Sequence, residues 1–365
     1  MVQRQGLKEL RPPMAARRTF LKQTIGVSLA LAAAGPAHSG DTVMKELGFL
    51  KPKRLLPGQT VGVIAPASNA WEDEDIRWAL DVVASMGFKT KEGKYLFQRD
   101  GYLAGRDEDR AEDVQAMFDD DSVDAIMCLR GGFGTLRMLH LLDYERIAKN
   151  AKLIIGFSDI TALLNAISAK SRMITFHGPV ARQEYSEYTL NEFKRVTMSG
   201  EAKGHVLGAP PPFEAGEGKA ERENRLIRIS PGTAEGQLIG GNLSLMTKLV
   251  GTPYEPDYRG KILFLEDVDE RPYRIDGMLT HLIVAGRLHQ LAGIAFGKCT
   301  DCNKDTPPTW SLERVLNDRL GNLGIPVLRG LMIGHIREQT TVPIGAMARL
   351  DVDAGQLILL EDPVR

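Results

Sequence analysis

Short, continuous apolar runs alternate with stretches of helical spacing through the first half of the chain. Residues 60–65 form one such run, which is the pattern of a strand buried on both faces of a parallel sheet. From Trp71 to Met86 the apolar positions fall at helical spacing, with acidic residues in the first turn and Gly87 just past the end. This pattern predicts a helix.

The same alternation continues with a helix predicted over 106–118 and a strand over 124–129. Repeated strand, loop and helix units predict an α/β fold, in which the N-terminal domain is an open, mostly parallel sheet with flanking helices. In such sheets, functional groups gather at the carboxyl ends of the strands.

The stretch that begins at Lys152 has an apolar run over 153–155, breaks at Gly156 and continues as a helix from Ile160. Ser158 lies on this break. A tight turn between a strand and a helix exposes one side chain at the top of a sheet beside free helical N–H groups, as in a nucleophile elbow. The second glycine of the usual Gly-x-Ser-x-Gly pattern is missing, and an alternative is that Ser158 and Asp159 cap a helix over 160–168.

Three glycines follow the strand 124–129, in the sequence Arg130-Gly-Gly-Phe-Gly134. Glycines let the backbone approach a ligand closely, and their N–H groups can hold an anion or an oxyanion. The spacing does not fit the dinucleotide-binding pattern Gly-x-Gly-x-x-Gly. A plain turn is the alternative.

The pattern loosens after the first 185 residues. We expect an N-terminal domain over 50–185, a connector over 186–232 that is rich in Gly, Pro and charge, and a smaller C-terminal α/β domain over 233–365. That last part has helical spacing over 243–249 and 274–285, and apolar runs over 262–265, 346–352 and 356–360.

The net charge is −1 over 365 residues. A charge near zero gives no electrostatic reason to expect nucleic acid or an anionic membrane as a partner. Hydrophobic residues make up 43% of the chain, which is typical of a globular protein with room for two cores. A peptide or another small molecule is therefore the expected partner.

The first forty residues differ from the rest. Arg17 and Arg18 precede Phe-Leu-Lys and an uncharged run over 24–34, and small residues follow up to Gly40. This order predicts an export signal of the twin-arginine kind over residues 1–40. The run is too short to span a bilayer, so we expect cleavage between Ala34 and Gly40 and a periplasmic product without stable membrane insertion.

The chain has three cysteines, Cys128, Cys299 and Cys302. The last two form a lone Cys-x-x-Cys, and no second pair supplies the ligands that zinc would need. We expect structural cysteines and no metal.

A serine nucleophile needs a base to take its proton and a carboxylate to orient that base. Of seven histidines, those on predicted helices, in the signal or near the connector are weaker candidates, which leaves His177 and His335. His335 follows Ile-Gly and precedes a long loop, a type of segment that often carries functional groups.

Eight short motifs then occur in a characteristic order: Gly62-Val-Ile-Ala-Pro-Ala-Ser68, Arg130-Gly-Gly-Phe-Gly134, Gly156-Phe-Ser-Asp-Ile-Thr161, Phe176-His-Gly-Pro179, Gly240-Gly-Asn-Leu243, Gly251-Thr-Pro253, Leu265-Glu-Asp267, and Gly334-His335 followed by Pro343-Ile-Gly345. From about Leu56 to the C-terminus, the chain resembles the LD-carboxypeptidases, serine peptidases that recycle or trim murein. The family also includes the microcin C immunity peptidases.

The resemblance implies a Ser–His–Glu triad of Ser158, His335 and Glu266. Residue patterns alone do not separate Glu266 from Asp267, because both end the same predicted strand. It also implies an oxyanion hole made by the backbone N–H groups of Gly132 and Asp159. Phe133 stands where many members have tyrosine, which puts a hydroxyl contact to substrate in doubt.

The family activity implies hydrolysis of the bond before the terminal D-alanine of a murein stem peptide, through an acyl-enzyme and without a cofactor. A carboxypeptidase must also hold a free carboxylate, for which Arg130 and Arg274 are candidates. A homodimer is a further expectation from the family.

Two other functions stay open at this point. One is a microcin-immunity type of peptidase that acts on peptidyl or aminoacyl nucleotides, although an export signal argues against it. The other is a periplasmic two-lobe binding protein without catalysis, which gives the three proposed triad residues no reason to converge.

Overall fold

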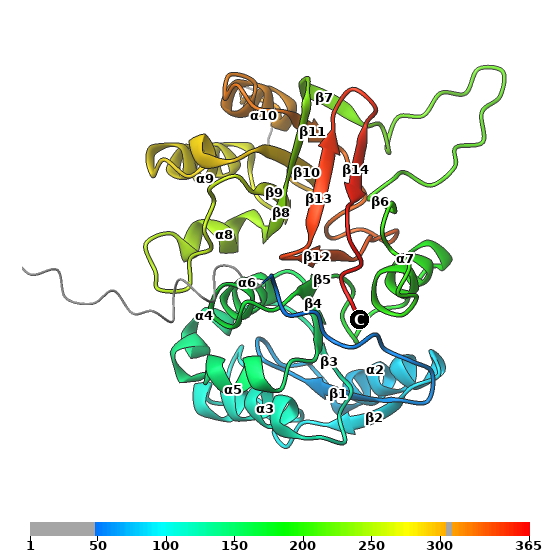
Figure 1. The fold of residues 1–365 in the computed structure, drawn as a ribbon, viewed down its shortest axis with the longest axis vertical. Coiled ribbons are helices and arrows are strands. Elements are labelled where there is room, and N and C mark those ends of the chain that lie inside the picture. The colour runs from blue at the N-terminus through cyan, green and yellow to red at the C-terminus, as the bar shows by residue number, and fades with distance from the viewer. Residues whose placement is uncertain (1–47, 304–308) are drawn as a thin grey trace, which may run out of the picture. The chain divides into compact units, whose positions relative to one another are not determined.

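The computed structural model describes residues 48–303 and 309–365. The export signal predicted over residues 1–40 lies outside the described residues. Within the described part, the strands form two sheets with helices around them (Figure 1).

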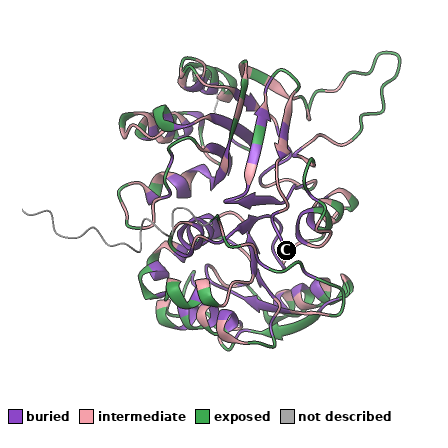
Figure 2. Ribbon diagram, in the orientation of Figure 1, coloured by how far each residue is buried: buried purple, intermediate pink, exposed green. Residues whose placement is uncertain are grey.

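The first sheet has the strand order β12-β5-β4-β3-β1-β2 among the described residues. All neighbours from β2 to β5 pair in parallel, and β12 pairs with β5 antiparallel. Its strands are β1 (Thr60–Ile64), β2 (Lys89–Glu92), β3 (Ala125–Cys128), β4 (Leu153–Gly156), β5 (Thr175–His177) and β12 (Val342–Ile344). Strands β3, β4 and β5 are buried along their whole length (Figure 2), as expected of the middle of a parallel sheet.

The helices of this half alternate with its strands, which confirms the predicted α/β pattern. They are α2 (Asp73–Ser85), α3 (Asp107–Asp119), α4 (Thr135–Met138), η1 (Leu139–Leu141), α5 (Tyr144–Lys149) and α6 (Ile160–Ser171). In α2 the buried residues are Ile76, Ala79 and Val83, which share one face at helical spacing.

The second sheet has the order β6-β14-β13-β8-β9-β10-β11-β7 in the described part of the chain. Its centre, from β8 to β11, is parallel, and antiparallel strands continue it on both sides. Its strands are β6 (Val206–Leu207), β7 (Ile227–Ser230), β8 (Thr233–Asn242), β9 (Ile262–Val268), β10 (Gly293–Thr300), β11 (Val327–Arg329), β13 (Met347–Asp351) and β14 (Gln356–Leu359).

Helices α8 (Leu243–Leu249), α9 (Pro272–Val284) and α10 (Leu312–Leu320), together with η2 (Leu288–Gln290), accompany the second sheet. The bounds of α8 agree with the prediction from sequence, and those of α9 differ by two residues at its start and one at its end. No described helix is long and apolar enough to cross a membrane.

The stretch 186–232, which we expected to be a connector, contains regular structure. It carries α7 (Glu187–Thr197) and the strands β6 and β7, which pair at the two edges of the second sheet. Helix α7 begins at Ser186, whose hydroxyl accepts a hydrogen bond from the Thr189 N–H. The sequence pattern did not predict these short elements, because the stretch is rich in Gly, Pro and charged residues.

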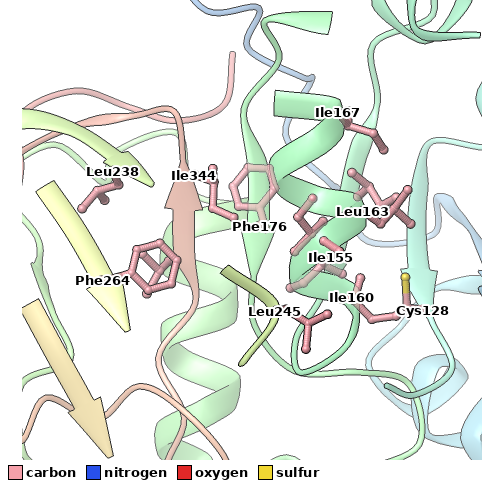
Figure 3. Packing of buried hydrophobic residues seen from close by; sticks show 14 of the residues in the cluster. Cys128, Ile155, Ile160, Leu163, Ile167, Phe176, Leu238, Leu245, Phe264 and Ile344 are labelled. Carbon is pink, nitrogen blue, oxygen red and sulfur yellow. The ribbon is translucent and has the colours of Figure 1, made fainter. Parts of the chain in front are cut away.

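The two halves share a core around α6 and β12. Strand β12 comes from the C-terminal part of the sequence, yet it extends the first sheet. In Figure 3, Phe176 and Ile344 of the first sheet lie toward Leu238 and Phe264 of the second sheet, and all four belong to one buried cluster. Helix α6 contacts β4, β5, β8, β12 and α8, so it packs against elements of both sheets.

Candidate active site

Ser158 lies in the turn between β4 and α6, as predicted. Its backbone has φ of 63°, a left-handed conformation that costs a non-glycine residue free energy and that marks nucleophile elbows. A Cβ added at Gly156 would lie 2.9 Å from a side-chain carbon of Ile160 and 3.1 Å from Cys128. The glycine before the serine is therefore required by packing, whereas Ile160 fills the position of the usual second glycine.

Helix capping does not account for these residues. Asp159 is the N-cap of α6, but its carboxylate makes no cap bond to that helix. It accepts hydrogen bonds from the Thr135 N–H at 2.8 Å and from the Thr135 hydroxyl at 2.9 Å. Within the described residues the Ser158 hydroxyl makes no hydrogen bond, and its oxygen is available for chemistry.

The structure brings Glu266 and His335 together, although 69 residues separate them in sequence. Oε2 of Glu266 and Nδ1 of His335 are 2.7 Å apart, and Glu266 is fully buried. A carboxylate on Nδ1 fixes the ring so that Nε2 is the basic nitrogen, as in hydrolase triads.

His335 is held beside the serine turn by its surroundings. The ring of Phe157, the residue before Ser158, lies 4.7 Å from the His335 ring between centroids. The Thr300 hydroxyl donates to the His335 carbonyl at 2.8 Å. A Cβ at Gly334 would lie 3.1 Å from Glu266 Oε2, so glycine is needed for the carboxylate to reach the ring.

The environment of His335 changes its pKa. Burial lowers the pKa of His335, but the hydrogen bond to Glu266 and the negative charge of that carboxylate outweigh burial, and the pKa is raised above its ordinary value of 6.5. A raised pKa strengthens His335 as a base.

Asp267 has a different role from its neighbour Glu266, a distinction that the sequence did not give. Its carboxylate accepts hydrogen bonds from the Asn242 amide at 2.9 Å, and from the Ser244 N–H and hydroxyl at 3.0 and 2.9 Å. Asp267 therefore anchors the start of α8, whereas Glu266 hydrogen-bonds to the His335 ring.

The glycine loop lies against the serine turn. A Cβ added at Gly131 would be 3.0 Å from the Ser158 hydroxyl and 3.2 Å from the Asp159 backbone N, so the two segments are in close approach. Gly132 has φ of 119°, and the Phe133 N–H donates to the Ser68 hydroxyl at 3.0 Å. The glycine loop and the turn that carries the Asp159 N–H are therefore in contact, as the predicted oxyanion hole requires.

A buried arginine forms hydrogen bonds that hold the glycine loop. Arg110 is 1% exposed, and its Nη1 donates to the Pro66 carbonyl at 2.6 Å and to the Gly134 carbonyl at 3.0 Å. Sequence reasoning missed Ser68, Arg110 and Thr135, because their contacts join segments far apart in the chain.

A cavity of about 230 Å³ adjoins the loop. Its lining includes Phe133, Leu136, Leu245 and Lys248, together with Asp159 next to the serine. Lys248 is a cation that the sequence did not single out.

The two predicted substrate arginines differ in environment. Arg130 is half-buried, donates to the Asn69 carbonyl at 3.2 Å, and has its pKa lowered by burial and by nearby Arg182. Arg274 is exposed on α9 and forms an ion pair with Glu270 at 2.6 Å. None of the contacts of Arg274 with other described residues connects it with the serine turn.

All three cysteines are free thiols, and Cys128 and Cys302 are buried. Among the described residues, no group of three or more His, Cys, Asp and Glu side chains is arranged to hold a metal ion. His177, the other candidate base, is completely buried on β5.

Comparison with solved structures shows which proteins share this fold. The microcin C7 self-immunity protein MccF in its apo state superimposes with a TM-score of 0.77 at 26% identity, over 87% of this chain and all of that one. Muramoyltetrapeptide carboxypeptidase from Oxalobacter formigenes gives a TM-score of 0.69 at 30% identity, over 82% and 97% of the two chains. Fold and sequence thus define a serine-type carboxypeptidase.

The family follows from the sequence comparisons. Models of the LD-carboxypeptidase N-terminal and C-terminal domains match residues 61–178 and 235–350. A Bacillus subtilis protein named "Probable murein peptide carboxypeptidase" is 42% identical over 304 residues, which cover 82% of this chain and 91% of the relative. The chain belongs to the LD-carboxypeptidase family.

Proposed function

We propose that this enzyme removes the terminal D-alanine from murein tetrapeptides by using Ser158, His335 and Glu266. The observation that carries the proposal is the Glu266–His335 pair, which the ring of Phe157 holds beside the strained turn of Ser158. Murein substrates are inferred from the names of the relatives in Bacillus and Oxalobacter.

In this mechanism, Nε2 of His335 takes the Ser158 proton while Glu266 holds Nδ1. The serine oxygen attacks the carbonyl of the L-configured residue before D-alanine, and the N–H groups of Gly132 and Asp159 stabilise the tetrahedral anion. His335 returns the proton to the amine of the departing D-alanine. A water molecule, deprotonated by the same ring, then hydrolyses the ester on Ser158.

The terminal carboxylate of the substrate needs a cation. Arg130 starts the glycine loop, and Lys248 lines the cavity beside that loop. We propose these two side chains, rather than Arg274, as its partners, since Arg274 is already paired with Glu270.

The test is D-alanine release from a muramoyl tetrapeptide by the purified protein. We expect Ser158→Ala to lose roughly 10⁴-fold or more in kcat, because nucleophile loss in serine peptidases has effects of this size. The matched control is Ser311→Ala, which alters the N-cap of α10 and should keep full activity.

A second control concerns the base. His205 also pairs with a glutamate, Glu192, at 3.0 Å. His205→Gln should leave turnover unchanged, whereas His335→Gln should abolish it. Equal activity of wild type and Ser158→Ala would overturn the mechanism, and hydrolysis of an aminoacyl nucleotide in place of the tetrapeptide would overturn the substrate.

A further inference from the structure

His177 is a buried histidine that the proposed mechanism does not use. It lies on β5 between Gly156 of β4 and Val342 of β12. Its ring makes edge contacts with Phe157 and Phe264, at 6.1 and 5.3 Å between centroids. Neither ring nitrogen has a hydrogen-bond partner within the described part of the chain.

The carboxyl group of the proposed triad has an unpaired atom as well. Oε2 of Glu266 bonds to His335, but Oε1 is buried and has no partner among the described residues. A buried acceptor left unpaired is costly because its desolvation is not compensated. Such groups in native proteins are usually paired with protein or with internal water.

Two threonine hydroxyl groups also lie near His177, and one of them is unpaired in the part of the chain that the structure describes. The Thr341 hydroxyl is buried without a partner among the described residues and would be 2.8 Å from a Cβ at Gly178, the residue after His177. A Cβ at Gly241 would be 3.1 Å from Nδ1 of His177 and 2.5 Å from the Thr161 hydroxyl. The ring therefore has polar atoms around it, in addition to its contacts with aromatic side chains.

The charged groups that act on His177 are Glu266 and His335, and Asp267 acts on His335 in turn. Burial lowers the pKa of His177 to about 4, against a smaller raising effect of Glu266. At neutral pH the ring is therefore uncharged, with one N–H donor and one acceptor nitrogen.

We propose that His177 is a positioning residue whose N–H reaches Oε1 of Glu266 through one internal water molecule. The inference rests on the proposed function, in which Glu266 orients His335. Each oxygen of the carboxylate then has its own donor: the His335 ring on Oε2 and the water on Oε1. The hydrogen bond from the water molecule to Oε1 holds the Glu266 carboxylate in place. It also stabilises the negative charge on Oε1, so the carboxylate raises the pKa of His335 less than it would without this bond.

Two substitutions separate this role from packing. His177→Phe keeps a planar ring but has no donor, whereas His177→Gln is smaller but keeps an N–H donor. Titration of His335 by NMR, in protein labelled with ¹⁵N-histidine, reports its pKa without any need for turnover.

We expect His177→Phe to raise the pKa of His335 by about one unit, the shift that corresponds to a hydrogen bond worth about 1.4 kcal/mol. His177→Gln should leave the pKa of His335 within about 0.3 unit of wild type, which corresponds to about 0.4 kcal/mol. The acid limb of kcat/KM against pH should move in the same direction, with little change in KM. Identical His335 titration in the two variants would overturn the proposal.

A measurement on the wild-type protein covers the case in which His177→Phe does not fold. We expect ¹⁵N spectra to show His177 neutral down to about pH 5, consistent with the lowered pKa, and its N–H proton to show a cross-peak to bound water. Protonation of His177 near pH 6.5, or no contact with water, would overturn the proposal. If the water-mediated contact between His177 and Glu266 is found but the protein releases no D-alanine, the proposed function is wrong and the role of His177 stands.

Discussion

At the scale of single residues, the site depends on the effect of the Glu266 carboxylate on the pKa of the His335 imidazole. The His335 side chain is partly exposed and is paired with a fully buried Glu266. The pairing raises the pKa of His335, and this has a direct consequence for the pH dependence of activity.

We expect kcat/KM to fall tenfold per pH unit below the pKa of His335, because the protonated ring cannot accept the serine proton. The midpoint of this acid limb should lie above 6.5, the ordinary pKa of histidine. In Glu266→Gln the charge that raises the pKa is gone while burial still lowers it, so any residual activity should show its acid limb at lower pH than wild type.

The rate itself should also drop in Glu266→Gln, by roughly 10⁴-fold, as for the orienting carboxylate of other serine peptidases. Asp267→Asn is the matched control on the same strand: Asp267 raises the pKa of His335 less than Glu266 does, so the acid limb of Asp267→Asn should move less than that of Glu266→Gln. An acid limb that does not move in Glu266→Gln would contradict the pairing.

The residues that the sequence revealed are those whose local context is distinctive. Ser158 interrupts a strand-to-helix transition, and His335 precedes a loop, so both could be proposed from the amino-acid pattern alone. Glu266 and Asp267 end the same strand, and only Asn242 and Ser244, brought in by another element, separate their roles. Such assignments depend on tertiary contacts that spacing does not encode.

At the scale of elements, the glycine loop and the serine turn act as one unit. Ser68 after β1, Arg110 on α3 and Asp159 before α6 all hold the segment from Gly132 to Thr135. The backbone of the loop that carries Gly132, the predicted oxyanion donor, is thus held by three neighbouring elements.

Thr135→Val tests this coupling, since it removes the hydroxyl that donates to Asp159 at 2.6 and 2.9 Å but keeps the side-chain volume. We expect kcat to fall by roughly 10- to 100-fold, less than the 10²–10³ for a lost oxyanion donor, with a smaller change in KM. Thr135→Ser keeps the hydroxyl and should stay close to wild type. Equal rates for Val and Ser would show that the bond does not position the donors.

Elements with a clear period were predicted well, and those defined by long-range pairing were not. Strand β1 and helix α8 follow from apolar runs and helical spacing. Strand β12 is only three residues long and pairs with β5 rather than with its sequence neighbours. The edge strands β6 and β7 are likewise defined by their pairing with other strands of the second sheet. Their sequences carry too few residues to show a period.

At the scale of the whole molecule, the proposed chemistry is divided between the sheets. Ser158 follows β4 of the first sheet, Glu266 lies on β9 of the second, and His335 lies in the loop that leads to β12. Because β12 returns to the first sheet, the segment that carries His335 is anchored at both halves.

We also propose that the chain is exported by the twin-arginine route and cleaved between Ala34 and Gly40. Expressed in a Gram-negative host, it should be found in the periplasm with a new N-terminus in that range. Arg17→Lys with Arg18→Lys should retain it in the cytoplasm, and Arg11→Lys is the matched control. Full-length chain in the periplasm, or export of the double variant, would contradict this assignment.

The most direct test of the account is detection of the acyl-enzyme. Protein that is turning over a murein tetrapeptide is quenched with acid, digested and analysed by mass spectrometry. We predict that the peptide containing Ser158 carries the muramoyl tripeptide as an ester. Release of D-alanine with no adduct on Ser158, together with undiminished activity of Ser158→Ala, would contradict it.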